Sequence, residues 1–189
     1  MDDVDRKIIS QLQIDGRTTF EALGKITGYT SMGAKKRVDK LLENGAIKVS
    51  AQLNLKHFDL CAAIVLIETD GPETMQRLLK RFEKCPRIVQ IFTTVGGYNM
   101  VALVAAENQK TLESISMEKC SIRSKKGIRR SEFYPIRETH YSHFLSLREN
   151  LTHKGLISPP CNVECKTCER YKSEECVGCP ATEDYRGPL

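Results

Sequence analysis

The sequence lacks the features that would place the protein in or across a membrane. It contains no apolar run of the length needed to span a bilayer. The first residues, MDDVDRKIIS, are acidic and then amphipathic, so we do not expect a secretory signal. We therefore expect a cytoplasmic protein with no membrane partner. In that compartment cysteines are kept as free thiols or metal thiolates rather than as disulfides.

A strong charge of one sign is also absent. The net charge is only +5 over 189 residues, from 29 Lys and Arg against 24 Asp and Glu. Such an excess permits nucleic-acid binding but does not argue for it, so local patterns must decide. Hydrophobic residues make up 40% and charged residues 28%, which is typical of a globular protein. The length allows one ordinary domain or two small ones.

Residues 1–50 predict three short helices. Apolar residues recur at helical spacing in residues 4–12 and again in residues 20–26. Thr18 and Glu21 predict a capping box for the second helix, and Thr30 or Ser31 can cap a third. Three helices with a tight turn before the third indicate a helix-turn-helix. We expect the β-rich segment AIKVSAQLNL that follows to form a wing.

The third predicted helix has an apolar side and a cationic side. Ala34, Val38, Leu41 and Leu42 cluster on one face, which we expect to enter the core. The opposite face and its flanks are cationic, as a helix in the major groove of DNA requires. A solvated surface is the alternative, because two acidic residues share the outward side. The residues expected at the groove are Ser31, Met32, Lys35, Lys36, Arg37 and Lys40.

Residues 5–48 carry a more specific pattern: an opening D-R-x-I, an L-Q-x-D-G-R break, an L-x-x-x-x-G turn, and R-V-x-x-L before NGAI. The segment resembles the winged helix-turn-helix of the leucine-responsive regulatory protein (Lrp/AsnC) family. The resemblance implies a transcription regulator that binds double-stranded DNA sequence-specifically. Ser31 and Gly33 stand where many members carry prolines, which predicts a different start of the recognition helix.

Residues 51–146 predict a ferredoxin-like βαββαβ domain. The apolar run LCAAIVLIETD predicts a buried strand, and an amphipathic helix follows it. Two β-rich runs meet at Gly96-Gly97, a pair suited to a tight hairpin. A weaker helix and a last β-type segment complete the order, so the whole chain is predicted to be α+β.

The same order resembles the second domain of the Lrp/AsnC family, the RAM domain. The resemblance implies a homo-oligomer formed through this domain, with a small-molecule effector bound near the hairpin. The matching positions are Gly96, Gly97, Tyr98 and Asn99. Asn99 stands where aspartate is usual, and an amide stabilises an ammonium group much less than a carboxylate does. The effector therefore stays unknown. The alternative is that the two glycines only form a hairpin.

Residues 161–189 predict a small cysteine-rich, metal-binding module after a linker at 147–160. Cys165-x2-Cys168 and Cys176-x2-Cys179 can supply four sulfurs to one zinc ion. Cys161 adds a C-x3-C-x2-C run, and Pro180 follows Cys179, as in some iron–sulfur sequences. Zinc and an iron–sulfur cluster both remain open. A disordered tail and disulfides are the alternatives. The isolated Cys61, Cys85 and Cys120 are interpreted as ordinary, mostly buried side chains.

The combined prediction is an oligomeric transcription regulator, not an enzyme, that responds to an effector or, through its cysteines, to a metal or redox change. An enzyme resembling siroheme decarboxylases, which act on a tetrapyrrole with a related two-domain build, is the alternative. Such chemistry needs clustered basic and histidine side chains. The chain has only His57, His140, His143 and His153, with no convincing cluster among them.

Overall fold

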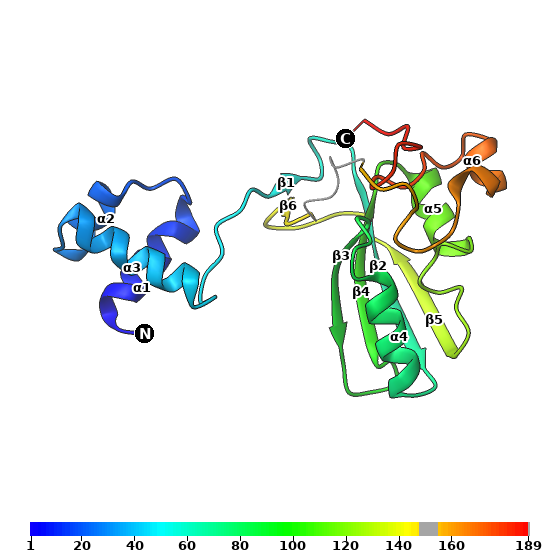
Figure 1. Cartoon of the computed structure of the whole chain (residues 1–189), viewed down its shortest axis with the longest axis horizontal. Helices are drawn as coiled ribbons and strands as arrows, with labels where there is room; N and C mark the ends of the chain where they lie inside the picture. Colours follow the sequence, from blue (N-terminus) through cyan, green and yellow to red (C-terminus); the bar gives the residue numbers. More distant parts are fainter. Residues whose placement is uncertain (148–154, 189) are drawn as a thin grey trace. The chain divides into compact units, whose positions relative to one another are not determined.

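The computed structural model describes residues 1–147 and 155–188. The chain forms two compact units, Met1–Ala51 and Gln52–Leu189 (Figure 1). Most of the predicted linker, residues 148–154, lies outside the described residues. Across the part that is described, none of the helices combines the length and the apolar character that a bilayer crossing requires. Each unit is built around its own hydrophobic cluster.

The first unit contains the three predicted helices, α1 (Asp3–Ile14), α2 (Phe20–Thr27) and α3 (Ser31–Glu43). Each helix contributes to one core, whose buried members are Ile8, Leu23, Ala34, Val38 and Leu41. The predicted apolar face of α3 is confirmed at its first three positions. Leu42, however, is 41% exposed, because it lies at the edge of that face near the end of the helix.

The helix starts differ from the prediction at one position. The hydroxyl of Thr18 donates to the carbonyl of Asp15 in the turn after α1, so α2 begins one residue later, with Thr19 as its N-cap. Thr30 caps α3 and accepts a hydrogen bond of 3.1 Å from the amide of Gly33. A proline-free start of the recognition helix is therefore stabilised by a side-chain cap.

The predicted wing does not form as a strand of the first unit. No strand is assigned within residues 44–52, although their composition is β-prone. The first strand, β1 (Leu53–Asn54), belongs to the second unit and pairs antiparallel with β6 (Phe144–Leu145). A strand needs a neighbouring strand for its backbone hydrogen bonds. The neighbour of β1 is β6, in which Phe144 pairs with Asn54.

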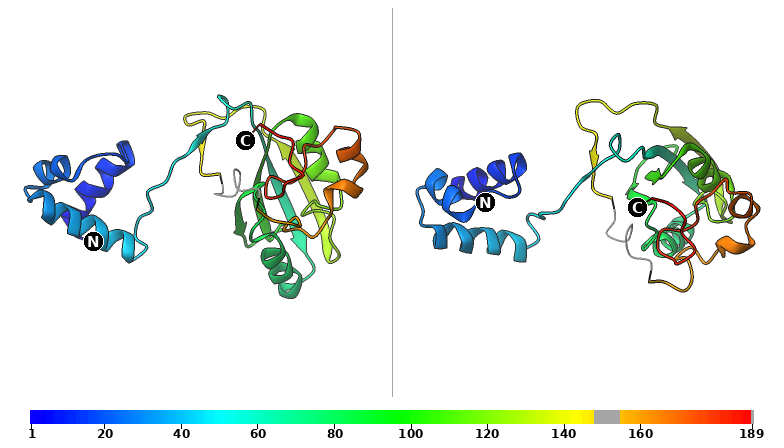
Figure 2. Two further views of the ribbon diagram at one scale, coloured as in Figure 1. Left: turned by 45° about the horizontal axis from the view of Figure 1, so that its top comes forward. Right: turned by 90° about the horizontal axis from the view of Figure 1, so that it is seen from above.

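The second unit contains the predicted ferredoxin-like sheet. Its elements are β2 (Cys61–Thr69), α4 (Pro72–Phe82), β3 (Ile88–Thr93), β4 (Met100–Ala106), α5 (Gln109–Met117) and β5 (Ile128–Pro135). The strand order is β3-β4-β2-β5, and every pairing is antiparallel. Both helices cover the same face of the sheet (Figures 1 and 2). The apolar run predicted as a buried strand is β2, which lies between β4 and β5.

The two faces of the sheet differ in burial. The helix-covered face buries Val65, Ile67 and Met100 almost completely. On the other face, Ile64 is 39% exposed, Phe92 53% and Tyr134 51%. Because side chains alternate along a strand, the apolar residues of β2 serve both faces. One face is thus a core, and the other is an exposed apolar surface.

The cysteine-rich tail packs against the ferredoxin-like domain within the second unit. Residues 155–188 contain a short 3-10 helix (Cys165–Thr167) and α6 (Glu169–Lys172), which lies beside α5 in Figures 1 and 2. Cys161 and Val163 belong to the hydrophobic cluster of the domain. Leu156 and Thr182 form a parallel bridge that holds the two ends of the tail together. The tail therefore extends the domain's core.

Candidate functional site

The outward side of α3 carries exposed cations. Lys35, Lys36 and Lys40 are exposed, as are Ser31 and Met32, the latter by 62%. These are five of the six residues predicted to reach a DNA groove. Their exposure leaves the side of α3 opposite the core accessible to a large ligand.

A close approach between α2 and the following turn fixes the position of α3. A Cβ atom added to Gly24 would lie 2.7 Å from the carbonyl oxygen of Tyr29, so only glycine fits there. Gly28 ends α2 with φ of 76°, a left-handed conformation that glycine adopts readily. The turn thus sets the angle between α2 and α3.

Arg37, the sixth predicted groove residue, is engaged within the first unit. Its guanidinium forms ion pairs of 2.7 Å with Asp2 and 3.2 Å with Asp5, both at the start of α1. It also lies 5.9 Å from the ring centroid of Tyr29. The hydrogen bond with Asp2 raises the pKa of Arg37 above its ordinary value. Arg37 therefore holds α3 against α1, a role that the helical pattern alone did not reveal.

The predicted effector hairpin joins β3 and β4. Asn99 fastens it to the end of β2: its side-chain oxygen accepts from the amide of Thr69 at 2.9 Å, and its side-chain nitrogen donates to the hydroxyl of Thr69 at 3.0 Å. A carboxylate can accept but cannot donate, so the amide is the group that completes this pair of bonds. Asn99 is a structural residue of the hairpin.

Three residues of β5, Arg130, Glu132 and Tyr134, form a network beside the rest of the hairpin. Tyr98 and Tyr134 both donate their hydroxyl hydrogen bonds to Glu132. The bonds from Tyr134 and Tyr98 lower the pKa of Glu132, while the bond to Glu132 raises the pKa of Tyr98. Arg130 stacks 4.3 Å from the Tyr98 ring centroid and donates to the carbonyl of Gly97 at 3.1 Å.

Arg130 and Glu132 were missed in the sequence because they lie more than thirty residues from the hairpin. The i, i+2, i+4 spacing of Arg130, Glu132 and Tyr134 on one strand is the signal that could have found them. The Arg130 guanidinium also lies close to Gly97, because a Cβ added there would be 3.3 Å from it. The hairpin therefore presents an aromatic, a cation and a carboxylate together.

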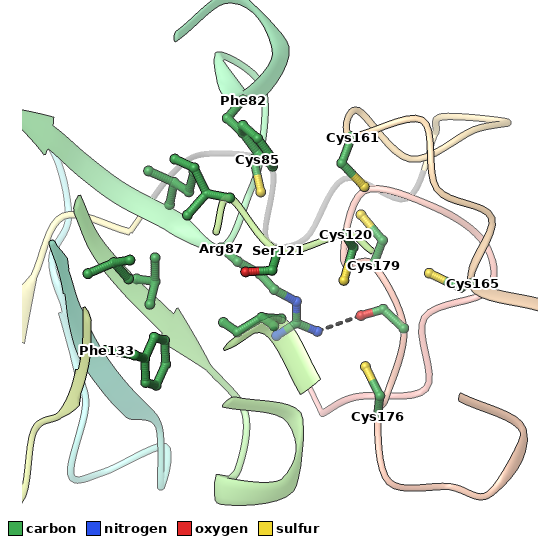
Figure 3. Close-up of a pocket in the computed structure, with 16 residues that line it drawn as sticks. Phe82, Cys85, Arg87, Cys120, Ser121, Phe133, Cys161, Cys165, Cys176 and Cys179 are labelled. Atoms are coloured by element: carbon green, nitrogen blue, oxygen red, sulfur yellow. Dashed lines mark hydrogen bonds between the residues drawn. The ribbon is translucent and has the colours of Figure 1, made fainter. Parts of the chain in front are cut away.

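A cavity of about 70 Å³ lies where the tail meets the ferredoxin-like domain (Figure 3). Its cysteines come from both parts: Cys85 and Cys120 from the domain, and Cys161, Cys165, Cys176 and Cys179 from the tail. Cys168, also predicted as a metal ligand, instead lines a neighbouring pocket beside Cys165 and Cys176. Cys85 and Cys120 were missed because each is isolated in the sequence, outside any recognisable spacing.

The cavity cysteines are free thiols. Burial suppresses the ionisation of four of them, Cys85, Cys120, Cys165 and Cys179. It raises the pKa of Cys120 and Cys179 to about 12, and that of Cys165 to about 11. Within residues 1–147 and 155–188, no three His, Cys, Asp or Glu side chains converge closely enough to hold a metal ion. A metal entering here would displace the thiol protons, so its binding would depend on pH.

A buried arginine joins the tail to the domain beside these cysteines. Arg87 donates to the carboxylate of Glu107. It also donates to the carbonyl of Gly178 in the tail, a bond drawn as a dashed line in Figure 3. Tyr185, also in the tail, donates to the other oxygen of Glu107 at 2.7 Å. Burial opposes the charge of Arg87, but the carboxylate of Glu107 raises its pKa above the ordinary value. The guanidinium therefore stays positively charged.

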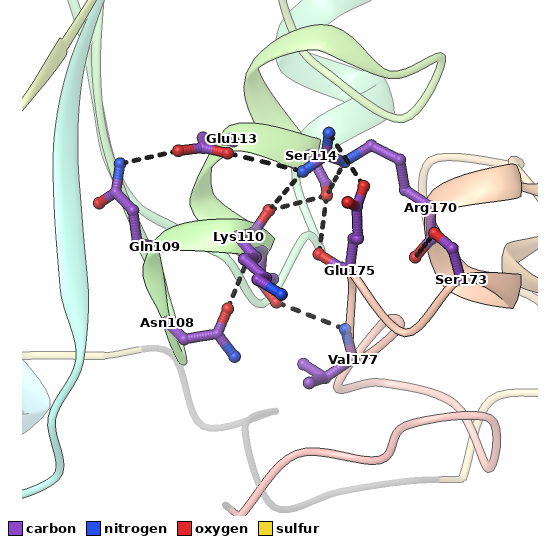
Figure 4. A network of polar contacts seen from close by, with 10 residues as sticks. Asn108, Gln109, Lys110, Glu113, Ser114, Arg170, Ser173, Glu175 and Val177 are labelled. Atoms are coloured by element: carbon purple, nitrogen blue, oxygen red, sulfur yellow. Dashed lines mark hydrogen bonds and ion pairs between the residues drawn. The ribbon is translucent and has the colours of Figure 1, made fainter.

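A second polar network holds the tail against α5 (Figure 4). Arg170 donates to the hydroxyl of Ser114 at 2.6 Å and forms ion pairs with Glu113 at 3.6 Å and Glu175 at 3.3 Å. Ser114 in turn donates to the carbonyl of Glu175 at 3.2 Å. These contacts explain how a segment with few large apolar residues takes a defined path.

A helix-turn-helix with an exposed cationic helix, followed by a ferredoxin-like domain, defines a class of transcriptional regulator. Comparisons with known proteins support this class. The family model for the AsnC-type helix-turn-helix domain matches residues 1–42, and the model for the Lrp/AsnC ligand-binding domain matches residues 62–144. The HTH-type transcriptional regulator FL11 of Pyrococcus furiosus is 31% identical over 116 residues, covering 60% of this chain and 76% of FL11.

Other relatives and solved structures agree. The HTH-type transcriptional regulator LysM of Saccharolobus solfataricus is 26% identical over 68% of this chain and 87% of its own length. The structure of Escherichia coli AsnC has the same fold, with a TM-score of 0.64 and 20% identity over 74% of this chain and 94% of AsnC. The chain belongs to the Lrp/AsnC family of transcriptional regulators.

Family membership settles the broad class of function. The matched domains are a DNA-binding and a ligand-binding domain, and the relatives are named as transcriptional regulators, so the protein is a regulator and not an enzyme. The alternative of a siroheme decarboxylase-type enzyme finds no support among them. Both matches end before the cysteine-rich tail, which begins at Cys161.

Proposed function

We propose that the N-terminal half of α3 enters the major groove of DNA and that Lys35, Lys36 and Lys40 contact phosphates and base edges there. The observation that carries this proposal is the opposition of the two sides of α3: Ala34 and Val38 are buried, while the three lysines are exposed. Ser31 and Met32 lie at the exposed start of the helix, where base readout is concentrated. Arg37 contributes by holding the helix in place.

The test is a double variant, Lys36→Ala with Lys40→Ala. The variant should bind all sequences more weakly, and its salt-dependence slope should be smaller by about 0.9 for each phosphate that a lysine no longer neutralises. The measurement is fluorescence anisotropy with duplex DNA over a range of salt concentrations. The matched control is Lys80→Ala with Lys84→Ala, which removes two exposed lysines from the second unit. Equal affinity and slope in both double variants would contradict the proposal.

The protein is a homo-oligomer assembled through the open face of its sheet. Ile64, Phe92 and Tyr134 leave an apolar surface on that face, and such surfaces in soluble proteins commonly mark protein contacts. A second copy offers the same surface, as two-fold assembly requires. Phe92→Glu should yield a smaller species in sedimentation, whereas Met117→Glu, an exposed apolar residue on α5, should leave the mass unchanged. An unchanged mass for Phe92→Glu would reject this interface.

A small-molecule effector binds at the hairpin of Gly96, Gly97, Tyr98 and Asn99. Asn99 is committed to Thr69, so it is not the group that recognises a charged ligand. Glu132, held ionised beside Tyr98, supplies a carboxylate in its place, and Arg130 supplies a cation. This combination suits an effector that carries both a positive and a negative group.

The C-terminal cysteines bind zinc or an iron–sulfur cluster, and this metal makes the regulator responsive to metal supply or oxidation. Support comes from four tail cysteines that line one cavity, Cys161, Cys165, Cys176 and Cys179. Purification without oxygen, followed by measurement of zinc, iron and the visible spectrum, tests the assignment. Protein that carries neither metal would reject it.

A further inference from the structure

The cavity at the junction of tail and domain has cysteines on one side and hydrocarbon on the other. Val65, Val104 and Phe133 line it from the sheet, and Phe82 lines it from the end of α4. One water molecule occupies roughly 10–15 Å³ of a cavity. A cavity of about 70 Å³ therefore has room for a group of several atoms rather than one ion.

The two domain cysteines lie at corresponding places in the fold. Cys85 follows α4, which ends at Phe82, and Cys120 follows α5, which ends at Met117. Both helices cover the same face of the sheet, and their C-terminal ends place these cysteines on the wall of one cavity (Figure 3). The tail brings Cys161, Cys165, Cys176 and Cys179 to that cavity. Thiols from two distant parts of the chain thus surround a single space.

We propose that this cavity binds a polynuclear iron–sulfur cluster whose ligands include Cys85 and Cys120 of the ferredoxin-like domain together with cysteines of the tail. The inference rests on the metal site proposed above and names both the group and its additional ligands. A zinc ion draws four sulfurs to a single centre at about 2.3 Å. A cluster has several iron atoms, so its ligand sulfurs stand farther apart, on different walls of the cavity. Each ligating thiol loses its proton as its bond to iron forms.

The surroundings suit such a cluster in two respects. The hydrocarbon wall limits the access of water, which is one of the factors that set the potential of a cluster. Arg87 supplies a buried positive charge close to Cys176 and Cys179. Thiolate ligands give a cluster negative charge, so a fixed cation beside them stabilises the assembled site. Glu107 keeps the guanidinium in place through its hydrogen bond.

The test begins with the full chain, supplied with ferric and ferrous iron and with sulfide under strictly anaerobic conditions, so that no further oxidant is needed to form the cluster. We expect iron and acid-labile sulfide to bind together, with a broad visible absorption. Cys85→Ala with Cys120→Ala should reduce both contents several-fold. Cys61→Ala, a half-buried cysteine outside the cavity, is the matched control and should keep them. Full iron and sulfide in the double variant would overturn the proposal, because the site would then lie in the tail alone.

Zinc bound without iron or sulfide would also overturn the cluster, while leaving the metal site proposed for the tail intact. DNA binding is measured on the same samples, so that failure of the groove proposal is seen separately. If the double variant does not fold, alkylation of the wild-type protein provides the answer. At a urea concentration that loosens the tail of the metal-free protein, Cys85 and Cys120 should be labelled after chelation and protected in the loaded protein, with Cys61 unchanged. Equal labelling of Cys85 and Cys120 in both states would overturn their role as ligands.

Discussion

The first unit buries Ile8, Leu23 and Val38 from three different helices, whereas the tail is fixed by contacts with the ferredoxin-like domain, some polar and some through Cys161 in that domain's core. Among the polar contacts, Arg170 of the tail donates to Ser114, and Arg87 of the domain donates to the carbonyl of Gly178 in the tail. The first unit thus has a core of its own, while the tail depends on the domain beneath it. Substitutions should therefore act in different ways in the two regions.

The largest effect is expected from Arg87→Ala in the second unit. The change leaves Glu107 buried without its partner, and breaking a buried ion pair in this way costs about 3–5 kcal/mol. The free energy of unfolding of the second unit should fall by that amount in a urea titration, and proteases should cleave the tail sooner. Arg129→Ala removes an exposed arginine from the same unit and serves as the control. An unchanged midpoint and cleavage rate would show that Arg87 does not hold the tail.

Leu23→Ala should have an effect of similar size, confined to the first unit. Leu23 is fully buried, and truncation of a buried leucine costs about 2–5 kcal/mol through reduced burial and a residual cavity. We expect loss of DNA binding near the temperature at which the first unit melts, with the cysteine cavity unaffected. Limited proteolysis of the full chain can follow the two regions separately. Equal destabilisation of the tail would show that the two units do not unfold independently.

The smallest effect concerns the ion pair between Asp2 and Arg37. The hydrogen bond from the Asp5 amide, assisted by Arg37, holds the pKa of Asp2 below its ordinary value of 3.8. The ionised form is therefore favoured by folding, so this contribution is present at neutral pH and disappears as the pH falls through the lowered pKa. Asp2→Asn should flatten the dependence of first-unit stability on pH in that acidic range. The same dependence in the variant and the wild type would show that Asp2 contributes nothing measurable.

Periodic patterns made most of the fold predictable. Apolar residues at helical spacing predicted α1, α2 and α3, and the order of strands and helices predicted the ferredoxin-like sheet. The wing was wrong as a strand of the first unit, because strand formation depends on a partner that composition does not specify. The start of α2 moved from Thr18 to Thr19 because the Thr18 hydroxyl is used in the preceding turn.

The candidate site was less accessible to sequence reasoning. The lysines of α3 followed from helical geometry, but the engagement of Arg37 by Asp2 depends on how α1 packs on α3. Cys85 and Cys120 have no spacing that marks them as ligands, and only the fold places them beside the tail. Arg87 carried no signal at all, because a buried cation is recognised by its partners and not by its neighbours in the sequence.

The cavity is lined by cysteines from early and late parts of the chain, so it can be completed only late in synthesis. Cys85 and Cys120 leave the ribosome well before the tail cysteines, the last of which lining the cavity is Cys179. The sheet and its two helices can therefore assemble while the two early thiols are still uncovered. The cavity is enclosed only when the tail docks and the carbonyl of Gly178 accepts the hydrogen bond from Arg87. A nascent chain that stops before that point would contain its DNA-binding helices, but its cavity would be open. The open cavity would distinguish it from a chain whose tail has been made.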